Sequence, residues 1–497
     1  MLTVHVRVSD AATGQPTPVR LRLLDADGVC RMPFGRLAEF AVGRGEDVGG
    51  QVRLGEAAFA YIDGVCEVGL PPGPVRVETH KGPEYRPLCR EVVLGPGKIA
   101  LRLTIERALD WRPRGWYCGD GRAQELSPHA ARLEGAAEGL DVVNLLAHER
   151  PPHSAGGTGV SPVGAFVNLL AFSGTQPALE GPPCVVVNTC NTHPILGTVA
   201  LLNCHRVVYP LRSGAPDGLD DWSVADWCDQ CHRKKGLVVW PDLPRLTPEH
   251  LQGEALAAVL LGKIDAFEIC RLGDLQSSAL ASWYRLLACG QRLPLVGASG
   301  KDRNTVVLGS VRTYARLEPN QEFSYGAWIE AVRAGRTFVT DGPLLSLTVN
   351  RHDPGSVLSL ANAGQTVRME AEARSVTPFD RLECVYNGAV VASSAASGDP
   401  STAMMEADVP IAGGWLAARC MNGSVVRAHT SPVYLQIEDR PVRPNADTTA
   451  PLLTVLDATL AWVLSEARCP SERQREQLRE TLQAARQELL RRGSKIG

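Results

Sequence analysis

The chain has 497 residues, which is long enough for three or four domains that each bury an apolar core. Its hydrophobic fraction of 44%, charged fraction of 21% and net charge of −3 are ordinary for a soluble protein, and the balanced basic and acidic residues argue against a nucleic-acid-binding surface. No apolar run approaches the roughly 18 residues that span a bilayer, and residues 1–8 alternate like a strand instead of resembling a signal peptide. We therefore expect a cytoplasmic protein that does not enter the membrane.

Residues 1–107 carry the period-two pattern of β-strands. Val4, Val6 and Val8 alternate with polar residues, and residues 99–105 repeat the alternation. Clusters of Gly and Pro mark turns between such runs. We predict an N-terminal β-sandwich. It would serve as a structural cap on the next domain or, alternatively, as a module that binds substrate or a partner.

Residues 108–345 alternate short apolar runs with amphipathic stretches, a pattern typical of βα units around a parallel sheet. The predicted strands cover 142–146, 185–188, 237–240, 266–269 and 295–297, and the predicted helices cover 222–234, 254–261 and 327–334. Between a strand at Trp116 and the strand at 142, Ser127 followed by Pro128 predicts the start of another helix.

Residues 346–438 return to β-type alternation, and we predict a second β-sandwich there. A Pro-rich linker is expected at 440–450, followed by a helical hairpin over residues 447–497. Ser471 with Gln474 has the spacing of a capping box for the second helix, and Leu478 and Leu482 lie on its apolar stripe. The hairpin should pack back on the preceding domains; assembly of a homo-oligomer through it is the alternative.

Three short motifs carry a resemblance to a known family. They are Gly-Trp-Tyr-Cys-Gly-Asp at 115–120, Gly-Leu-Val-Val-Trp-Pro at 236–241 and Gly-Arg-Thr-Phe-Val-Thr-Asp-Gly-Pro at 335–343. With these motifs the chain resembles the metallohydrolases of the polymerase-and-histidinol-phosphatase (PHP) superfamily, in the branch named for carbaryl hydrolase. The resemblance implies a distorted (β/α)7 barrel, similar to a TIM barrel, between the two β-sandwiches. It also implies an active site of metal-bound water at the strand ends.

The resemblance places the site on seven positions, which are Asp120, Arg122, Gln124, His148, Asp242, Gly300 and Asp302. Arg122 and Gln124 stand where the family has two histidines, Asp242 where it has another, and Gly300 where it has a carboxylate. His148 keeps the family's residue. Arginine stays protonated and repels a cation, so we expect a pseudoenzyme without a cofactor. A remodelled site would hold Zn, Mn or Fe on His148 and Asp242, with His193 or Glu268.

Several residues support more than one interpretation. Arg122 suits a small anionic ligand, such as a carboxylate or phosphate, or a salt bridge that fills the vacated metal site. The segment Cys228–His232 has the spacing of c-type haem attachment, but it lies in a predicted helix of a cytoplasmic protein, so we expect no haem. A zinc site with Cys190, Cys204, His193 and His205 is the alternative. Most of the 14 cysteines should be free, buried thiols.

Three functions remain open at this point. The first is a metallohydrolase-like protein that has lost its metal centre and binds a ligand or protein partner. The second is a hydrolase of esters or phosphoesters with a remodelled metal site. The third is a structural scaffold whose sandwiches and hairpin are the working parts. Because activity depends on the site and not on the fold, the sequence leaves the substrate, partner and oligomeric state open.

Overall fold

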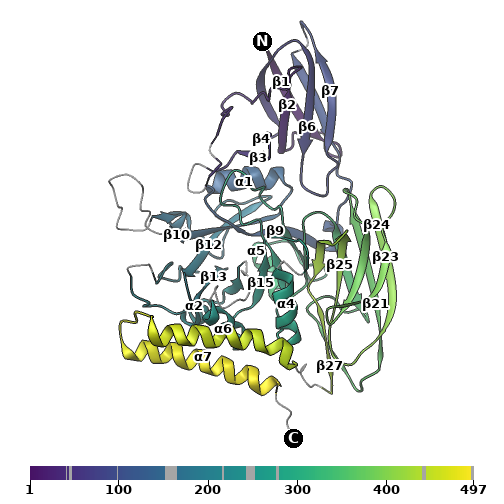
Figure 1. The fold of residues 1–497 in the computed structure, drawn as a ribbon. Coiled ribbons are helices and arrows are strands. Elements are labelled where there is room, and N and C mark those ends of the chain that lie inside the picture. The colour runs from purple at the N-terminus through teal and green to yellow at the C-terminus, as the bar shows by residue number, and fades with distance from the viewer. Residues whose placement is uncertain are drawn as a thin grey trace.

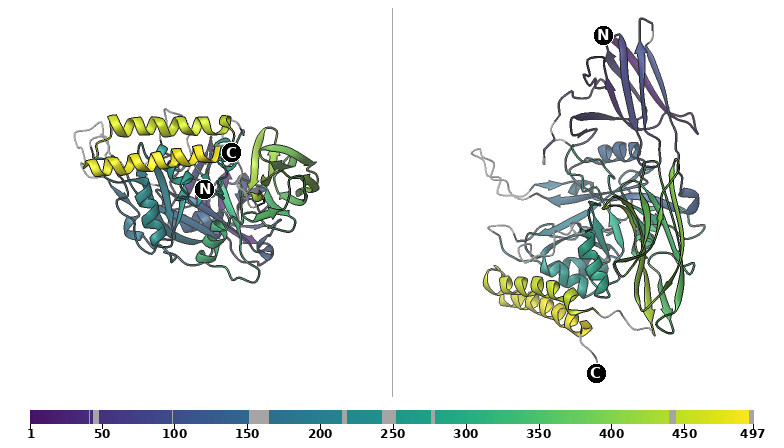
Figure 2. Two further views of the ribbon diagram at one scale, coloured as in Figure 1. Left: turned by 90° about the horizontal axis from the view of Figure 1, so that it is seen from below. Right: turned by 45° about the vertical axis from the view of Figure 1, so that its right-hand side comes forward.

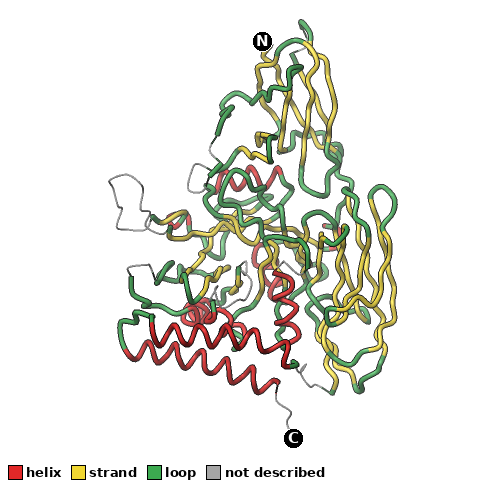
Figure 3. Tube along the Cα trace, in the orientation of Figure 1, coloured by secondary structure: helices red, strands yellow, loops and turns green. Residues whose placement is uncertain are grey.

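The computed structural model divides into an N-terminal β-rich part, a central mixed region, a C-terminal pair of sheets and two long helices (Figure 1). It describes residues 1–40, 42–43, 48–97, 99–150, 165–214, 218–241, 252–275, 279–438 and 444–493. Strands dominate the N-terminal and C-terminal parts, whereas the helices gather around the central region and below it (Figure 3).

Two sheets with a shared apolar core form the N-terminal part. Its strands are β1 (Leu2–Asp10), β2 (Val19–Leu24), β3 (Gln51–Leu54), β4 (Ala57–Ile62), β5 (Val65–Leu70), β6 (Gly73–His80), β7 (Leu88–Leu94) and β8 (Ala100–Ile105). One sheet has the order β5-β1-β8 and the other β3-β4-β2-β6-β7. Val4, Val6 and Val8 are fully buried and pack against Leu21 and Leu23 of the facing sheet, as their alternation with polar residues predicts.

The central region builds on a mixed sheet. Its strands are β9 (Trp116–Ala123), β10 (Val142–Glu149), β11 (Phe166–Val167), β12 (Cys184–His193), β13 (Gly197–Leu202), β14 (Leu237–Trp240), β15 (Ala266–Ile269), β16 (Leu295–Gly297), β17 (Arg312–Arg316) and β18 (Thr337–Thr340). Its helices are α1 (Pro128–Ala137), α2 (Val224–Arg233), α3 (Gly253–Leu260), α4 (Ala279–Ala288) and α5 (Tyr325–Arg333), with short 3₁₀ turns η1 (Arg112–Arg114) and η2 (Leu169–Ala171).

The predicted (β/α)7 barrel is wrong for this sheet. Among the described residues the hydrogen-bonded strands run in the order β16-β15-β14-β13-β12-β10-β9-β17-β18 and then continue outward through β26, β25, β22 and β23, without closing into a barrel. Strand β13 is antiparallel to both of its neighbours, and β17 is antiparallel to β9. A tight turn, not a helix, joins β12 to β13, so the alternation of apolar runs correctly located strands but gave no information on their direction.

The C-terminal sheets share a core with the end of the central sheet. Their strands are β19 (Leu344–Val349), β20 (Val357–Leu360), β21 (Thr366–Ser375), β22 (Arg381–Tyr386), β23 (Ala389–Ala395), β24 (Ser401–Pro410), β25 (Gly414–Asn422), β26 (Val425–Thr430) and β27 (Val433–Ile437). One sheet has the order β19-β21-β24, and the other is the extension of the central sheet, which passes from β18 to β26. Hydrogen bonding is therefore continuous from the central region into the C-terminal part.

Helices α6 (Ala446–Ser465) and α7 (Glu472–Gly493) lie side by side along the base of the central region (Figures 1 and 2). Leu478, Leu482 and Leu489 of α7 are buried in the same apolar cluster as α3, so the pair packs back on the protein. Helix α6 begins inside the expected linker because the side chain of Asn445 accepts a hydrogen bond from the amide of Thr448. By length and composition α6 alone among the described helices is apolar enough to cross a membrane, with a mean hydropathy of 1.3.

Candidate functional site

Asp120 lies in the second half of β9, and its carboxylate holds two loops in place. Oδ1 accepts hydrogen bonds from the amides of Ser299 and Arg122, each at 3.0 Å. Oδ2 accepts from the amide of Gly309 at 2.8 Å and from the hydroxyl of Ser299. The residue is fully buried, and burial raises the pKa of Asp120 despite these hydrogen bonds. Both carboxylate oxygens are thus committed to the protein itself.

Arg122, two residues along the same strand, pairs with Glu268 of β15. Nε lies 3.0 Å from Oε1 and Nη2 lies 2.7 Å from the same oxygen, and Nε also lies 3.1 Å from Oε2. The Glu268 side chain is completely buried and that of Arg122 is 14% exposed. Burial acts to lower the pKa of Arg122, but attraction to Glu268 outweighs it and raises the pKa. A salt bridge therefore occupies the position where the resemblance implies metal ligands.

Gln124 and Gly300 lie beside this pair, and neither provides a metal ligand. The amide of Gln124 donates to the carbonyl of Lys301 at 2.7 Å, and the amide of Gly300 donates to the carbonyl of Arg122 at 3.0 Å. Gly300 has a φ of +59°, and a Cβ there would come within 3.3 Å of Nη2 of Arg122. Asp302 accepts a hydrogen bond from Nε of Arg303 at 2.8 Å. The position of the expected carboxylate is thus a glycine that faces a guanidinium group.

His148, at the end of β10, belongs to a different cluster. Its Nε2 lies 3.0 Å from Oε1 of Glu125, whose other oxygen accepts from Arg150, and its Nδ1 lies 3.3 Å from the carbonyl of Leu146. Burial acts to raise the pKa of Glu125, but the hydrogen bonds from His148 and Arg150 lower it to about 2. Sequence reasoning missed Glu125, because nothing in the local pattern marks it as the partner of a histidine 23 residues away.

His193 is held as a structural histidine. Its Nδ1 accepts from the amides of Ile195 and Leu196 at 3.2 and 3.0 Å, which leaves the proton on Nε2. That Nε2 donates to Oδ1 of Asp220 at 3.0 Å. The amide of Arg468, in the turn between α6 and α7, donates to the other oxygen of Asp220. His193 therefore helps to anchor the helical pair. Asp242, the last position of the predicted set, lies outside the described residues.

The cysteine-rich segment forms a buried thiol cluster. Cys228 and Cys231 are buried on α2, and Sγ of Cys231 lies 3.3 Å from Sγ of Cys204. The neighbouring His232 pairs with Asp265 at 3.0 Å, and Nδ1 of the exposed His205 lies 3.4 Å from the carbonyl of Lys234, so neither histidine joins the thiols. Within the described ranges no three His, Cys, Asp or Glu side chains come together as metal ligands.

The arrangement does not fit a metal cluster of the kind that the resemblance implies. Metal-activated water needs several carboxylate or imidazole ligands that converge on one point. Here the candidate ligands are divided among three separate pairs, which are Arg122 with Glu268, His148 with Glu125, and His193 with Asp220. The first pair contains the guanidinium group of Arg122, which stays positively charged and repels a metal ion.

Comparison with known proteins adds no family. No protein-family model and no curated protein matches the chain. Among solved structures, the N-terminal four Ig domains of Dscam1 isoform 8.4 align with 10% sequence identity, over 88% of this chain and 97% of that chain, with a TM-score of 0.13. A TM-score this low carries no argument about fold or function.

Proposed function

We propose that this protein is a non-catalytic relative of the PHP-type metallohydrolases and that it works by binding a ligand or a protein partner. The observation that carries this proposal is the buried pair between Arg122 and Glu268. A guanidinium with two bonds to a carboxylate neutralises the buried acidic group of Glu268. The relationship to the metallohydrolases rests on the three motifs at 115–120, 236–241 and 335–343.

The same pair argues against Arg122 as the anion-binding residue. Its Nε and Nη2 both donate to Glu268, so an incoming carboxylate or phosphate would have to displace a buried, bidentate partner. Displacing Glu268 would separate this buried carboxylate from the guanidinium group of Arg122, which costs about 3–5 kcal/mol. A ligand is therefore expected to bind elsewhere on the protein.

Metal content tests the proposal directly. The full-length protein is measured by elemental mass spectrometry before and after incubation with Zn, Mn and Fe(II), and in parallel it is assayed for hydrolysis of ester and phosphoester substrates. We expect metal at background level and no hydrolysis above the buffer rate. The proposal fails if a metal binds at near-stoichiometric level and is lost in His148→Ala, because that result supports a remodelled hydrolase.

A gain-of-function variant sharpens the same test. Arg122→His, Gln124→His and Gly300→Asp together restore the residues that the family has at these positions. The matched control carries Arg122→Gln, Gln124→Ala and Gly300→Ala, which changes the same three positions without adding a histidine or a carboxylate. Metal bound by the first variant and absent from the control would support descent from a metallohydrolase. Equal metal content in the two would contradict it.

A further inference from the structure

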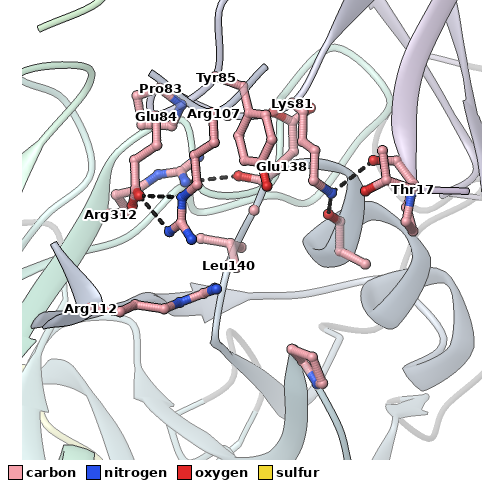
Figure 4. A pocket seen from close by; sticks show the side chains of 15 residues that line it. Thr17, Lys81, Pro83, Glu84, Tyr85, Arg107, Arg112, Glu138, Leu140 and Arg312 are labelled. Carbon is pink, nitrogen blue, oxygen red and sulfur yellow. Dashed lines mark hydrogen bonds and ion pairs between the residues drawn. The ribbon is translucent and has the colours of Figure 1, made fainter. Parts of the chain in front are cut away.

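A small cavity lies where the N-terminal part meets α1 and β17 (Figure 4). Its volume is about 220 Å³. Its walls come from segments distant in sequence, which are the end of the loop before β2, the loop between β6 and β7, the segment from β8 to η1, the C-terminal end of α1, Pro182 and the start of β17. Charged and apolar residues both line it. The charged residues are Lys81, Glu84, Arg107, Arg112, Glu138 and Arg312.

Four of these side chains are cations and two are carboxylates, so the lining has an excess of positive charge. Figure 4 shows the four cations placed around the cavity. Arg107 is neutralised by Glu84, to which it donates from Nε at 3.0 Å and from Nη2 at 2.5 Å. Arg112 pairs with Asp141 at 2.6 Å. These two arginines therefore have acidic partners within the protein.

Lys81 and Arg312 differ from them, because both are buried and bonded to neutral acceptors. Nζ of Lys81 donates to the carbonyls of Pro18 and Ala136 at 2.9 and 2.7 Å. Arg312 donates from Nε to the carbonyl of Gly309 at 2.8 Å and from Nη1 to the carbonyl of Glu138 at 2.9 Å. Their exposed fractions are 8% and 4%. Neither side chain lies within 4.0 Å of a carboxylate in the described part of the chain.

The carboxylate of Glu138 does not supply the missing charge. It accepts a hydrogen bond from the hydroxyl of Tyr61 at 3.0 Å and lies 3.5 Å from Nη1 of Arg20, so it is engaged by the N-terminal sheet. Carbonyl groups at the C-terminal end of α1 accept hydrogen bonds from some of the N–H groups of Lys81 and Arg312. A lysine has three donors and an arginine has five, so both side chains keep donors beyond those that the carbonyl groups use.

We propose that this cavity is a binding site for a small oxyanion of the phosphate class, held by Lys81 and Arg312 with Arg112 at the cavity wall. Both buried cations hydrogen-bond to neutral carbonyl groups, and an anion in the cavity would add compensating charge that these groups do not supply. The volume of about 220 Å³ admits one tetrahedral anion and excludes a nucleotide-sized ligand. The site shares no lining residue with the Arg122–Glu268 pair, so it stands whether or not that pair excludes metal.

The anion has two possible sources, free phosphate or the head of a phosphomonoester. A second hollow of about 300 Å³ shares Gly82, Tyr85, Glu138 and Arg312 with the first and has further room toward Arg427. An ester with a short organic tail would place its phosphate in the first cavity and its tail in the second. Free phosphate would occupy the first cavity alone.

Calorimetric titration of the full-length protein tests the site with inorganic phosphate, glycerol phosphate and sodium chloride at equal ionic strength. We expect saturable phosphate binding that falls at least tenfold in Lys81→Met and in Arg112→Gln. Arg22→Gln is the control, because Arg22 pairs with Glu78 in the N-terminal sheet away from the cavity. If Arg312→Met does not fold, the Lys81 and Arg112 variants still decide the question.

Tighter binding of glycerol phosphate than of phosphate would assign the site to an ester, and the reverse to the free anion. Either outcome supports the proposal. Heat that does not saturate or that chloride reproduces would overturn it, as would binding that survives the Lys81 and Arg112 changes.

Discussion

Nη2 of Arg122 and Oε1 of Glu268 lie 2.7 Å apart, although the strands that carry them, β9 and β15, are not neighbours in the sheet. The pair therefore ties together two strands that backbone hydrogen bonds do not join. It also compensates the negative charge of Glu268, which would otherwise attract a cation.

Removal of one partner of this pair should be more harmful than removal of both. Arg122→Met removes the guanidinium group that pairs with the buried Glu268 carboxylate, which should lower the free energy of unfolding by about 3–5 kcal/mol. The double variant Arg122→Met with Glu268→Met should recover most of that loss. Urea unfolding followed by circular dichroism measures both. Arg368→Met, which breaks exposed pairs with Glu370 and Glu406, is the control and should change stability by less than about 1 kcal/mol.

Equal losses in the single and double variants would contradict this account of the pair. They would mean that packing of the side-chain stems, and not charge compensation, is the main contribution at this site.

The contact between α3 and α6 leaves no room for a methyl group at Gly253. A Cβ there would lie 2.0 Å from Oγ1 of Thr459, so Gly253→Ala should push α6 away at a cost of about 1–3 kcal/mol. Hydrogen exchange over residues 446–493 should increase in this variant. Gly326→Ala, in a helix position with open space around it, is the matched control and should be neutral or slightly stabilising. Unchanged exchange in Gly253→Ala would show that the helices are not docked in this way.

The ion pair at Glu125 should give stability a defined dependence on pH. Its pKa is lowered to about 2, so the stabilisation that it contributes is fully present above pH 4.5 and is lost as pH falls toward 2. Wild type should therefore be more stable than Glu125→Gln at pH 7, and the difference should shrink steadily below pH 4.5. Chemical unfolding at a series of pH values measures it. A difference that stays constant down to pH 3 would contradict the assignment.

Anion binding in the proposed cavity should weaken in alkaline solution. Burial lowers the pKa of Lys81 to about 8, so its charge is lost as pH rises through that value. The groups that act on it are Glu138 and Asp10, which oppose this shift, Arg112 and Arg107, which favour it, and the ring of Tyr85. Sulfate, which does not titrate in this range, is the probe. Its affinity should be constant well below pH 8 and should fall as pH rises through 8, whereas Lys81→Met should show a flat profile.

Local features of the fold were predictable because short-range chemistry determines them. The side chain of Ser127 accepts from the amide of Ala130 at the start of α1, and that of Ser471 accepts from the amide of Gln474 at the start of α7, as their spacing predicts. Strand direction was not predictable, because the apolar pattern of β13 is the same for a parallel and an antiparallel neighbour. Helix α4 was missed altogether.

The candidate site, too, was predictable only in part. The identity of Arg122 in place of a histidine was visible in the sequence and raised the prospect of a salt bridge. Its partner Glu268 could not be predicted from the sequence, because it lies 146 residues away and no local pattern links the two residues. The cavity around Lys81 and Arg312 escaped sequence reasoning for the same reason, since its walls come from segments that only the tertiary fold brings together.

Gly82 shows how tightly the N-terminal part is joined to the rest. It has a φ of +61°, and a Cβ there would lie 2.1 Å from the carbonyl oxygen of Glu138, so the backbones are in direct contact. Close by, the hydroxyl of Tyr314 donates to Glu84 at 2.7 Å. A fragment that starts at residue 108 would lose both contacts and expose the end of α1. Residues 1–107 should therefore be kept together with the rest of the chain when the protein is expressed or its domains are exchanged.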